Sequence, residues 1–446
     1  MISKQNSVIH KFSPNPTFEK GAYRFFDNDK VTEKDLIKAI TDQCESSCIQ
    51  KDVTVIIDTC TFCLESKYNR LKTRDNMGIV FQNGKSNSYG FEAHSSLVYD
   101  NSDIPLGFSD IELITPGVVN KYEKGKGWQA RQEPIEAKQS YKWLQSCEQS
   151  KIVLSQAKHI TFVADRECDI IELYDRVKDE KSDFLVRSRF NRNTVDAAGI
   201  HQKMKDLLST CQIQKQIKIE VINEFNKNEI KTIGLKYVTC NLKWPKQKNV
   251  QIKNHPHGVP VTIIQAIEIS EQPKEKKINW ILVSSKEIKD INEALTEVKR
   301  YEQRWLIEEL HKLLKTDGFD LENNQMEQAS SVRKLLLMAM KASIKVLQLK
   351  ASREGATDLK TEEVFDKEEI ECLEELNMEL KGTTVKQSNP HVKENLAWAA
   401  WIIARLGGWK EFYNAKRPPG NKTFADGLDR FDAILMGYKL KKRYVS

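Results

Sequence analysis

The pattern of hydrophobic and polar positions predicts two buried strands that each run into an aspartate. Residues 53–57 and 160–164 are almost entirely apolar or β-branched, and the runs stop abruptly at Asp58 and Asp165. Continuous runs of this kind are typical of strands that are covered on both faces of a sheet. The sequence therefore predicts two strands that deliver carboxylates at their carboxyl ends.

The remaining periodicity predicts an alternation of strands and helices. The expected elements are strands at 95–99, 111–114, 183–188, 216–222, 232–238 and 260–269, and helices at 31–40, 135–150, 169–179 and 332–349. From residue 51 to residue 188 the order is β-β-β-α-β-α-β, which indicates an α/β fold. The region from Arg192 to Trp280 has strands alone, and the chain beyond residue 330 is helical.

A segment near residue 300 carries polar residues at helical intervals. In a regular helix of about 100° per residue, four of them would lie within an arc of roughly 60°, with leucines on the other side. The four are Tyr301, Arg304, Glu308 and Lys315, and the leucines are Leu306, Leu310 and Leu313. Such a stripe combines a carboxylate with groups that bind phosphate oxygens. An ordinary amphipathic helix with a charged outer face has the same pattern, so both interpretations stay open here.

The two strand-end aspartates and Glu308 together form a more specific combination. A buried carboxylate needs a cap, a cation or a metal ion, so either aspartate alone could simply cap the next turn. Three carboxylates from two strands and a helix can hold a pair of Mg²⁺ ions about 4 Å apart for chemistry at phosphorus. We therefore interpret Asp58, Asp165 and Glu308 as candidate metal ligands.

Composition is compatible with this interpretation without suggesting it. The chain has 446 residues, 39% of them hydrophobic, which is enough for about three domains. It has no apolar run that could span a bilayer and no secretory leader at its start, so we expect a bacterial cytoplasmic protein that associates with DNA and not with a membrane. The nine cysteines are expected to be reduced, and their spacing does not predict a zinc finger.

Charge is informative only where it is concentrated. The net charge of +7 comes from 70 basic and 63 acidic residues, an excess too small to establish nucleic-acid binding. Arg187, Arg189 and Arg192, however, lie at and just beyond the end of the strand expected at 183–188. They either line a path for phosphates or are solvated charges at a strand end.

The spacing Tyr301-x2-Arg304-x3-Glu308-x6-Lys315 resembles the signature of the DDE transposases of the insertion-sequence-four family. Further blocks are similar, in the same order, to those of the family member carried by the bacterial kanamycin-resistance transposon. These blocks are Gly21–Phe25, Asp58-Thr59, Asp165–Asp169, Val186–Ser188, Trp280–Ser285 and Ile403–Gly408. The resemblance covers the chain from about residue 20 to about residue 430.

The resemblance implies a ribonuclease-H-like catalytic core with an inserted β-rich subdomain, plus helical N- and C-terminal regions. The expected domains are 1–50, a short helical DNA-binding region; 51–192, the first part of the core; 193–296, the inserted subdomain; 297–350, the completion of the core by the Glu308 helix; and 351–446, a helical dimerisation region. The segment ahead of Asp58 is shorter than in the family by a few tens of residues. In the family, the missing part belongs to the region that helps to recognise the terminal repeats. The resemblance therefore supports the catalytic chemistry more fully than specific binding of transposon ends.

The resemblance also implies a cut-and-paste transposase that uses two Mg²⁺ ions, with Mn²⁺ as a substitute. Asp58, Asp165 and Glu308 would hold the ions. The expected contacts to DNA are Tyr301, Arg304, Lys315, Lys312, Arg187 and Trp280. Trp280 would stack on an unpaired base, although a tryptophan in this apolar run is also typical of a core residue. The implied partners are double-stranded DNA at terminal inverted repeats, target DNA, and a second copy of the chain in the DNA complex.

Two other functions stay open on the sequence alone. A catalytically silent DNA-binding regulator of an element would be favoured if a carboxylate were missing, and Asp58, Asp165 and Glu308 are all present. A metal-dependent nuclease without strand transfer would use the same three carboxylates.

Overall fold

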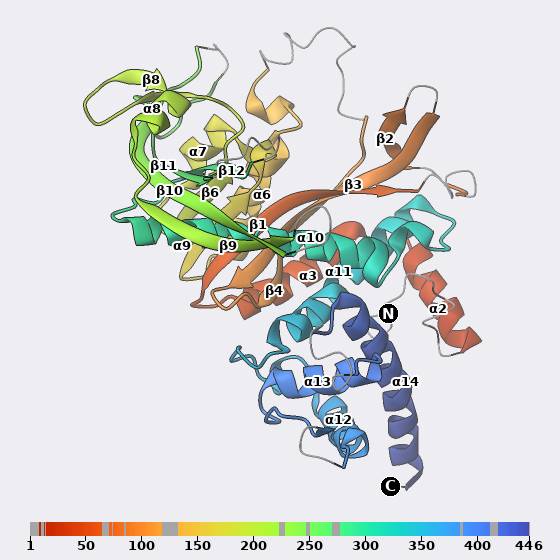
Figure 1. Ribbon diagram of the computed structural model, residues 1–446. Helices are drawn as coiled ribbons and strands as arrows, with labels where there is room; N and C mark the ends of the chain where they lie inside the picture. Colours follow the sequence, from red (N-terminus) through yellow and green to blue (C-terminus); the bar gives the residue numbers. More distant parts are fainter. Residues whose placement is uncertain are drawn as a thin grey trace. The chain divides into compact units, whose positions relative to one another are not determined.

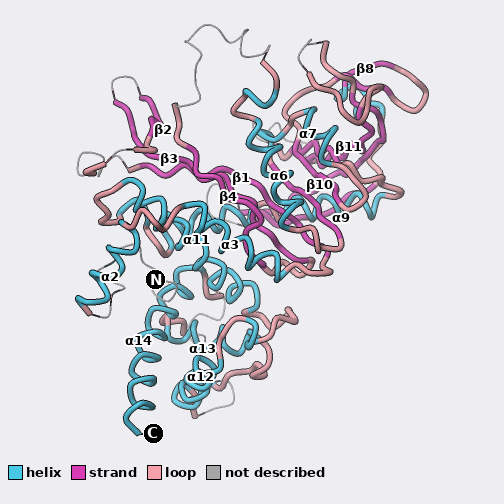
Figure 2. Tube along the Cα trace, turned by 180° about the vertical axis from the view of Figure 1, so that it is seen from behind, coloured by secondary structure: helices cyan, strands magenta, loops and turns pink. Residues whose placement is uncertain are grey.

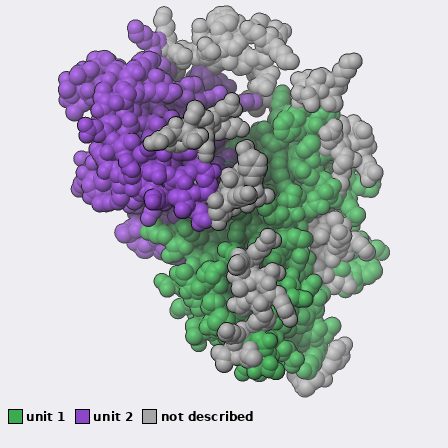
Figure 3. Space-filling model, in the orientation of Figure 1, with its two compact units in different colours: residues 1–47, 59–118, 306–446 green, residues 48–58, 119–305 purple. Residues whose placement is uncertain are grey.

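The computed structural model describes residues 9, 13, 15–64, 71–73, 75–83, 86–117, 133–222, 228–246, 250–269, 277–383, 387–410 and 418–445. They form an α/β protein that divides into two compact units (Figure 3). The sheet unit comprises residues 48–58 and 119–305, and the helical unit comprises residues 1–47, 59–118 and 306–446. Among the described residues, no helix is both long enough and apolar enough to cross a membrane.

A mixed sheet forms the centre of the sheet unit (Figure 1). Three neighbouring strands of this unit run parallel, in the order β1 (Asp52–Cys63), β5 (His159–Ala164) and β6 (Ser182–Arg187). The antiparallel strands that follow are β12 (Asn279–Ser284), β11 (Val259–Glu268), β10 (Asn228–Leu242), β9 (Lys215–Ile222), β7 (Asn193–Val195) and β8 (His201–Lys203). The strands expected in an insertion thus join the same sheet through β12, and the domain boundaries drawn from the sequence stay a prediction.

Helix α9 packs against the strands of this unit. The helices here are α6 (Tyr141–Val153), α7 (Ile171–Val177), α8 (Met204–Thr210) and α9 (Ile291–Glu302), with 3₁₀ turns at Ile135–Ala137 and Arg166–Cys168. Ala294 and Val298 of α9 are buried in one apolar cluster with residues of β5, β6, β10, β11 and β12. Arg300 donates a hydrogen bond from Nη1 to Thr161 Oγ1 on β5, at 2.6 Å. The last turn of α9 is therefore held at the parallel strands.

The helical unit is built around a long buried helix. Its strands are β2 (Gly78–Asn83), β3 (Ser86–Asp100) and β4 (Pro105–Ile114), and its helices are α2 (Pro16–Asp27), α3 (Glu33–Ser47), α10 (Trp305–Lys312, from Leu306 on), α11 (Ala329–Ser352), α12 (Lys367–Leu380), α13 (Leu396–Leu406) and α14 (Asn421–Val445), with short helical turns at Leu313–Asp317, Leu321–Asn323 and Thr361–Glu363. Helix α11 contacts α2, α3, α13, α14 and β4 (Figure 2). Leu335, Leu337, Ala339 and Leu349 of α11 are fully buried, which makes this helix the core of the unit.

Helix α3 confirms the helix expected at 31–40. Thr32 Oγ1 accepts a hydrogen bond from the Asp35 backbone N–H at 3.2 Å, and the Asp35 carboxylate accepts one from the Thr32 N–H at 3.1 Å. This reciprocal pair satisfies two N–H groups at the start of the helix. The helix continues to Ser47, beyond its expected end.

The prediction that the first strand ends at Asp58 is wrong. Strand β1 continues to Cys63, because residues 59–63 are threonine, cysteine and phenylalanine, which favour extended backbone. The Leu64 N–H then donates to the Tyr89 carbonyl of β3 at 2.8 Å. Asp58 is therefore the last residue of β1 within the sheet unit, and the strand itself goes on.

The single polar stripe expected over 301–315 is also wrong as drawn. Helix α9 ends at Glu302, and a tight turn follows in which the Arg304 N–H donates to the Tyr301 carbonyl at 3.1 Å. Helix α10 begins at Trp305, and residues 313–317 form a π-helical turn. The physical reason is burial: Tyr301 belongs to the core of the sheet unit, whereas Ile307 is buried in the helical unit, so one regular helix does not serve both.

Candidate active site

The parallel strands of the sheet unit bring three predicted site residues into one row. Ile57 of β1 pairs with Ala164 of β5, and Ala164 pairs with Val186 of β6. The next residue on each strand is Asp58, Asp165 and Arg187, respectively. Neighbouring strands are about 4.8 Å apart, and residues at matching positions of parallel strands project to the same face. Two carboxylates and a guanidinium therefore lie side by side at the same end of these three parallel strands.

Both aspartates have partners and remain half-buried. Asp58 Oδ2 lies 3.3 Å from Arg304 Nη1, and the Asp58 side chain is 20% exposed. Asp165 Oδ1 accepts a hydrogen bond from the Glu167 N–H at 2.8 Å, which opens the 3₁₀ turn at Arg166–Cys168. The capping role left open for a strand-end aspartate is thus present at Asp165. It uses one carboxylate oxygen of the two.

Tyr301 connects this row to the end of α9. Its ring meets Trp280 of β12 edge-on, with centroids 5.3 Å apart and planes at 70°, and the Arg187 guanidinium lies 5.9 Å from the Trp280 ring centre. Burial raises the pKa of the Tyr301 phenol; the guanidinium groups of Arg304 and Arg187 oppose that shift, and the Asp165 charge adds to it. The phenol therefore stays protonated and acts as a hydrogen-bonding group.

Trp280 packs against the apolar cluster of the sheet unit and is partly buried. The structure thus favours the core role left open for this tryptophan, while its half-exposed ring keeps the stacking role a prediction. Tyr301 is 3% exposed. Because the ring is buried, only the hydroxyl group of Tyr301 could make the predicted contact with phosphate.

The other predicted residues lie in the helical unit. Glu308 is on α10 and is half-buried. Lys315 Nζ is 3.7 Å from Glu322 Oε1 and 5.6 Å from the Phe62 ring centre. Lys312 is more exposed and pairs with Asp317 at 3.2 Å.

The donor chemistry of the aspartates fits a hard divalent cation. Carboxylate oxygens are the ligands that Mg²⁺ and Mn²⁺ prefer, and Asp58 and Asp165 offer them at neighbouring, half-exposed positions. Glu308 belongs to the helical unit and the aspartates to the sheet unit. Within the part of the chain that the structure describes, no three histidine, cysteine or acidic side chains are grouped as a metal site. The metal ligand set stays a prediction.

Two acidic residues of the site region were missed as separate candidates by sequence reasoning. Glu322 accepts a hydrogen bond from the Cys63 N–H at 2.9 Å in addition to its contact with Lys315. No signal in the sequence marks it, because its partners are remote along the chain. Asp169 is fully buried and collects hydrogen bonds from the loop after β6. Its position four residues after Asp165 is the signal that could have singled it out.

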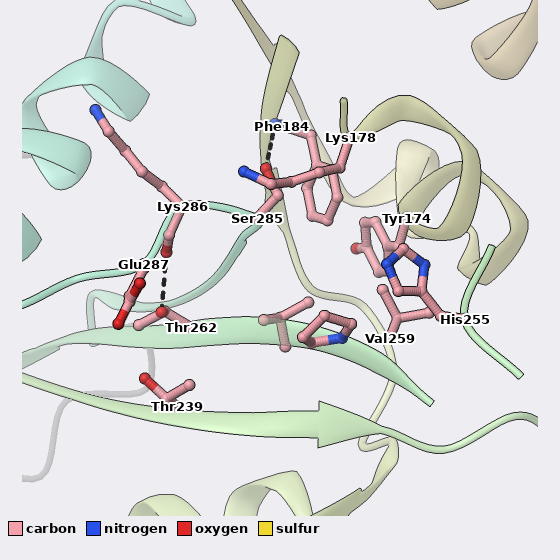
Figure 4. A pocket seen from close by; sticks show the side chains of 12 residues that line it. Tyr174, Lys178, Phe184, Thr239, His255, Val259, Thr262, Ser285, Lys286 and Glu287 are labelled. Atoms are coloured by element: carbon pink, nitrogen blue, oxygen red, sulfur yellow. Dashed lines mark hydrogen bonds between the residues drawn. The ribbon is translucent and has the colours of Figure 1, made fainter. Parts of the chain in front are cut away.

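The sheet unit also has a cavity of about 230 Å³, drawn in Figure 4, and its lining does not include Asp58, Asp165 or Arg187. Phe184 near the start of β6 and Ser285 just past the end of β12 line it, and the Phe184 N–H donates to Ser285 Oγ at 2.9 Å. Lys178 at its wall is paired with Asp183 at 2.6 Å. Burial alone would raise the pKa of Asp183, but hydrogen bonds from Lys178 and Ser285 outweigh it and lower that pKa. The charge of Lys178 at the cavity wall is thus already paired with Asp183.

Comparison with known families matches residues 141–344 to the transposase DDE domain. The matched segment contains Asp165, Arg187, Tyr301, Arg304 and Glu308 and begins after Asp58. The match supports a DDE transposase, an enzyme that acts on DNA, and such domains generally use divalent metal ions.

Proposed function

We propose that the protein is a cut-and-paste DNA transposase of the insertion-sequence-four family, similar to the transposase of the kanamycin-resistance transposon. Its catalytic core would be ribonuclease-H-like and would work as a homodimer on double-stranded DNA. The main support is that Asp58 and Asp165 directly follow Ile57 and Ala164, the last pair between β1 and β5, in a chain of which residues 141–344 match the transposase DDE domain. In an α/β sheet, ligands bind beyond the carboxyl ends of the parallel strands, and the two aspartates lie where the pairing of β1 with β5 ends.

Asp58, Asp165 and Glu308 would hold two Mg²⁺ ions, which when bound supply Lewis-acid polarisation of the attacking oxygen and of the phosphate. Arg304 can hold the Asp58 carboxylate in place, since the two side chains are in contact at 3.3 Å. Lys312 and Lys315 would bind phosphate oxygens by charge. Arg187 and Tyr301 would bind them through a guanidinium and a phenol that stays protonated.

The reaction consists of phosphoryl transfers without a covalent protein intermediate. A water oxygen first bonds to the phosphorus at the transposon end, and the bond from phosphorus to the 3′ oxygen breaks, which frees a 3′-hydroxyl. That hydroxyl then attacks the opposite strand and expels its 3′ oxygen, so that a hairpin closes the transposon end. Water then attacks the hairpin phosphorus, and the bond to the 3′ oxygen breaks, which regenerates the 3′-hydroxyl and leaves a 5′-phosphate. The 3′-hydroxyl finally attacks a phosphodiester of target DNA and expels its 3′ oxygen. Nicking and hairpin opening are hydrolyses, and hairpin formation and target joining exchange one phosphodiester for another, so no external energy source is required.

Incubation with a supercoiled plasmid that carries the DNA flanking this gene tests the function. With Mg²⁺ we expect nicked, hairpin and inserted products, and with EDTA none of the three, because ligand carboxylates alone do not polarise phosphate. Specific binding without any cleavage would instead favour the silent regulator. Cleavage with neither hairpins nor insertions would favour the stand-alone nuclease.

A further inference from the structure

Two buried carboxylates of the sheet unit, Asp169 just before helix α7 and Asp175 within it, each bind a different loop. The Asp169 and Asp175 side chains both have no exposed surface. Each accepts hydrogen bonds from backbone N–H groups of a distant loop, and each is paired with a basic side chain, Arg192 or His255. They form a natural pair for comparison, because only one of the two loops lies at the candidate active site.

Asp169 gathers an unusually complete set of donors. The Tyr174 hydroxyl donates to its Oδ1 at 2.9 Å, and Arg192 donates to the same oxygen from Nε at 2.9 Å and from Nη2 at 2.6 Å. On Oδ2 it accepts from Ser188 Oγ at 3.1 Å and from the N–H groups of Arg189 at 2.7 Å and Phe190 at 2.9 Å. Both oxygens are saturated, so Asp169 itself has little capacity left for a ligand.

These bonds fix the backbone directly after Arg187. Ser188, Arg189 and Phe190 are the next three residues of the chain, and all three donate to one carboxylate that lies four residues beyond Asp165. A buried carboxylate with charged and backbone donors is among the strongest polar contacts in a protein. Asp169 thereby joins the loop after β5 to the loop after β6, at the end of the strands where Asp165 and Arg187 lie.

We infer that Asp169 is a positioning residue for the reaction, acting through Arg187. By locking residues 188–192 it holds the Arg187 guanidinium against Tyr301 and Trp280 and beside Asp165. This role rests on the proposed function, because Arg187 matters only if DNA is bound at this edge. Asp175 ties residues 253–255 to the far end of α7 and has no part in it.

The test compares Asp169→Asn with Asp175→Asn, which removes the matched carboxylate. Both variants should unfold at lower temperature by similar amounts, since each loses a buried charge with backbone donors. At a temperature where both are folded, Asp169→Asn should nick plasmid DNA on the order of 10–100-fold more slowly than wild type, and Asp175→Asn within about threefold. Arg192→Lys, which keeps a positive charge but loses the double contact, gives the same direction if Asp169→Asn does not fold.

A double-mutant cycle separates positioning from simple destabilisation. If Asp169 acts through Arg187, then Arg187→Ala should cost little further activity in the Asp169→Asn background, because the guanidinium is already displaced. Equal loss in Asp169→Asn and Asp175→Asn, or multiplicative loss in the double variant, would overturn the positioning role and leave the transposase standing. A wild-type protein that neither binds nor cuts DNA would overturn both.

Discussion

Glu308→Gln is expected to slow DNA nicking by about 10³-fold or more while DNA affinity stays within about twofold of wild type. Glutamine keeps the size of the side chain and removes only its charge, so a phosphate-binding surface beside it is unchanged. If Glu308 is the third metal ligand, the lost Lewis-acid polarisation is worth several kcal/mol in the transition state. Nicking of a supercoiled plasmid at saturating protein measures the rate, and fluorescence anisotropy with labelled DNA measures the affinity.

The adjacent glutamate is the control for this prediction. Glu309 Oε2 accepts hydrogen bonds from Lys350 Nζ at 2.6 Å and from Asn421 Nδ2 at 2.9 Å, so it ties α10 to α11 and α14. Glu309→Gln should cost about 1–2 kcal/mol of unfolding free energy and leave nicking within about threefold of wild type. If Glu308→Gln and Glu309→Gln had equal activity, Glu308 would lose its assigned role.

Arg333→Met is expected to lower the free energy of unfolding by about 3–5 kcal/mol. The Arg333 side chain is 6% exposed and binds Glu33 through Nε at 2.6 Å and through Nη2 at 2.9 Å. It also donates to the carbonyls of Leu113 and Asn76 and lies 5.4 Å from the Phe91 ring centre. Methionine fills much of the space but removes the donors to the Glu33 carboxylate and to the Leu113 carbonyl, whereas the Asn76 carbonyl keeps a hydrogen bond from Thr115 Oγ1 at 3.1 Å. Urea denaturation followed by circular dichroism measures the change.

Lys38→Met provides the comparison for an exposed ion pair. Lys38 and Asp42 are one helical turn apart on α3, at 2.7 Å, with side chains 72% and 54% exposed. Such a pair contributes little to stability, since both charges stay in water. A loss for Arg333→Met as small as that for Lys38→Met would mean that the contacts of Arg333 do not hold the helical unit together.

The placement of the two aspartates was predictable from the sequence, because buried parallel strands have a strong apolar signature. Two runs that stop at Asp58 and Asp165 predict carboxylates at the ends of two strands, and the structure pairs the residues directly before them, Ile57 of β1 and Ala164 of β5. The end of β1 was not predictable in the same way. An aspartate after an apolar run is typical of the end of a strand. Here the threonine, cysteine and phenylalanine residues from Thr59 to Cys63 continue the extended backbone.

The break between α9 and α10 could not be predicted, because the polar residues from Tyr301 to Lys315 keep their helical spacing on both sides of it. Which core each half enters depends on contacts with strands far away in sequence, such as those of Tyr301 with Trp280. The same limit applies to the hydrogen bonds of Asp169 and Asp175, which join residues about 20 and about 80 positions apart. A local pattern marks a carboxylate, and only the fold supplies its donors.

We propose that Asp58, Asp165 and Glu308 share a divalent cation when the protein acts on DNA. Iron-directed cleavage tests it most directly: Fe²⁺ with ascorbate and peroxide, in the presence of DNA, cuts the protein backbone next to the bound ion. A shared ion should give cuts near residues 58, 165 and 308 together, all suppressed by excess Mg²⁺. Cuts near 58 and 165 with the segment around 308 intact, or cuts that Mg²⁺ does not suppress, would contradict it.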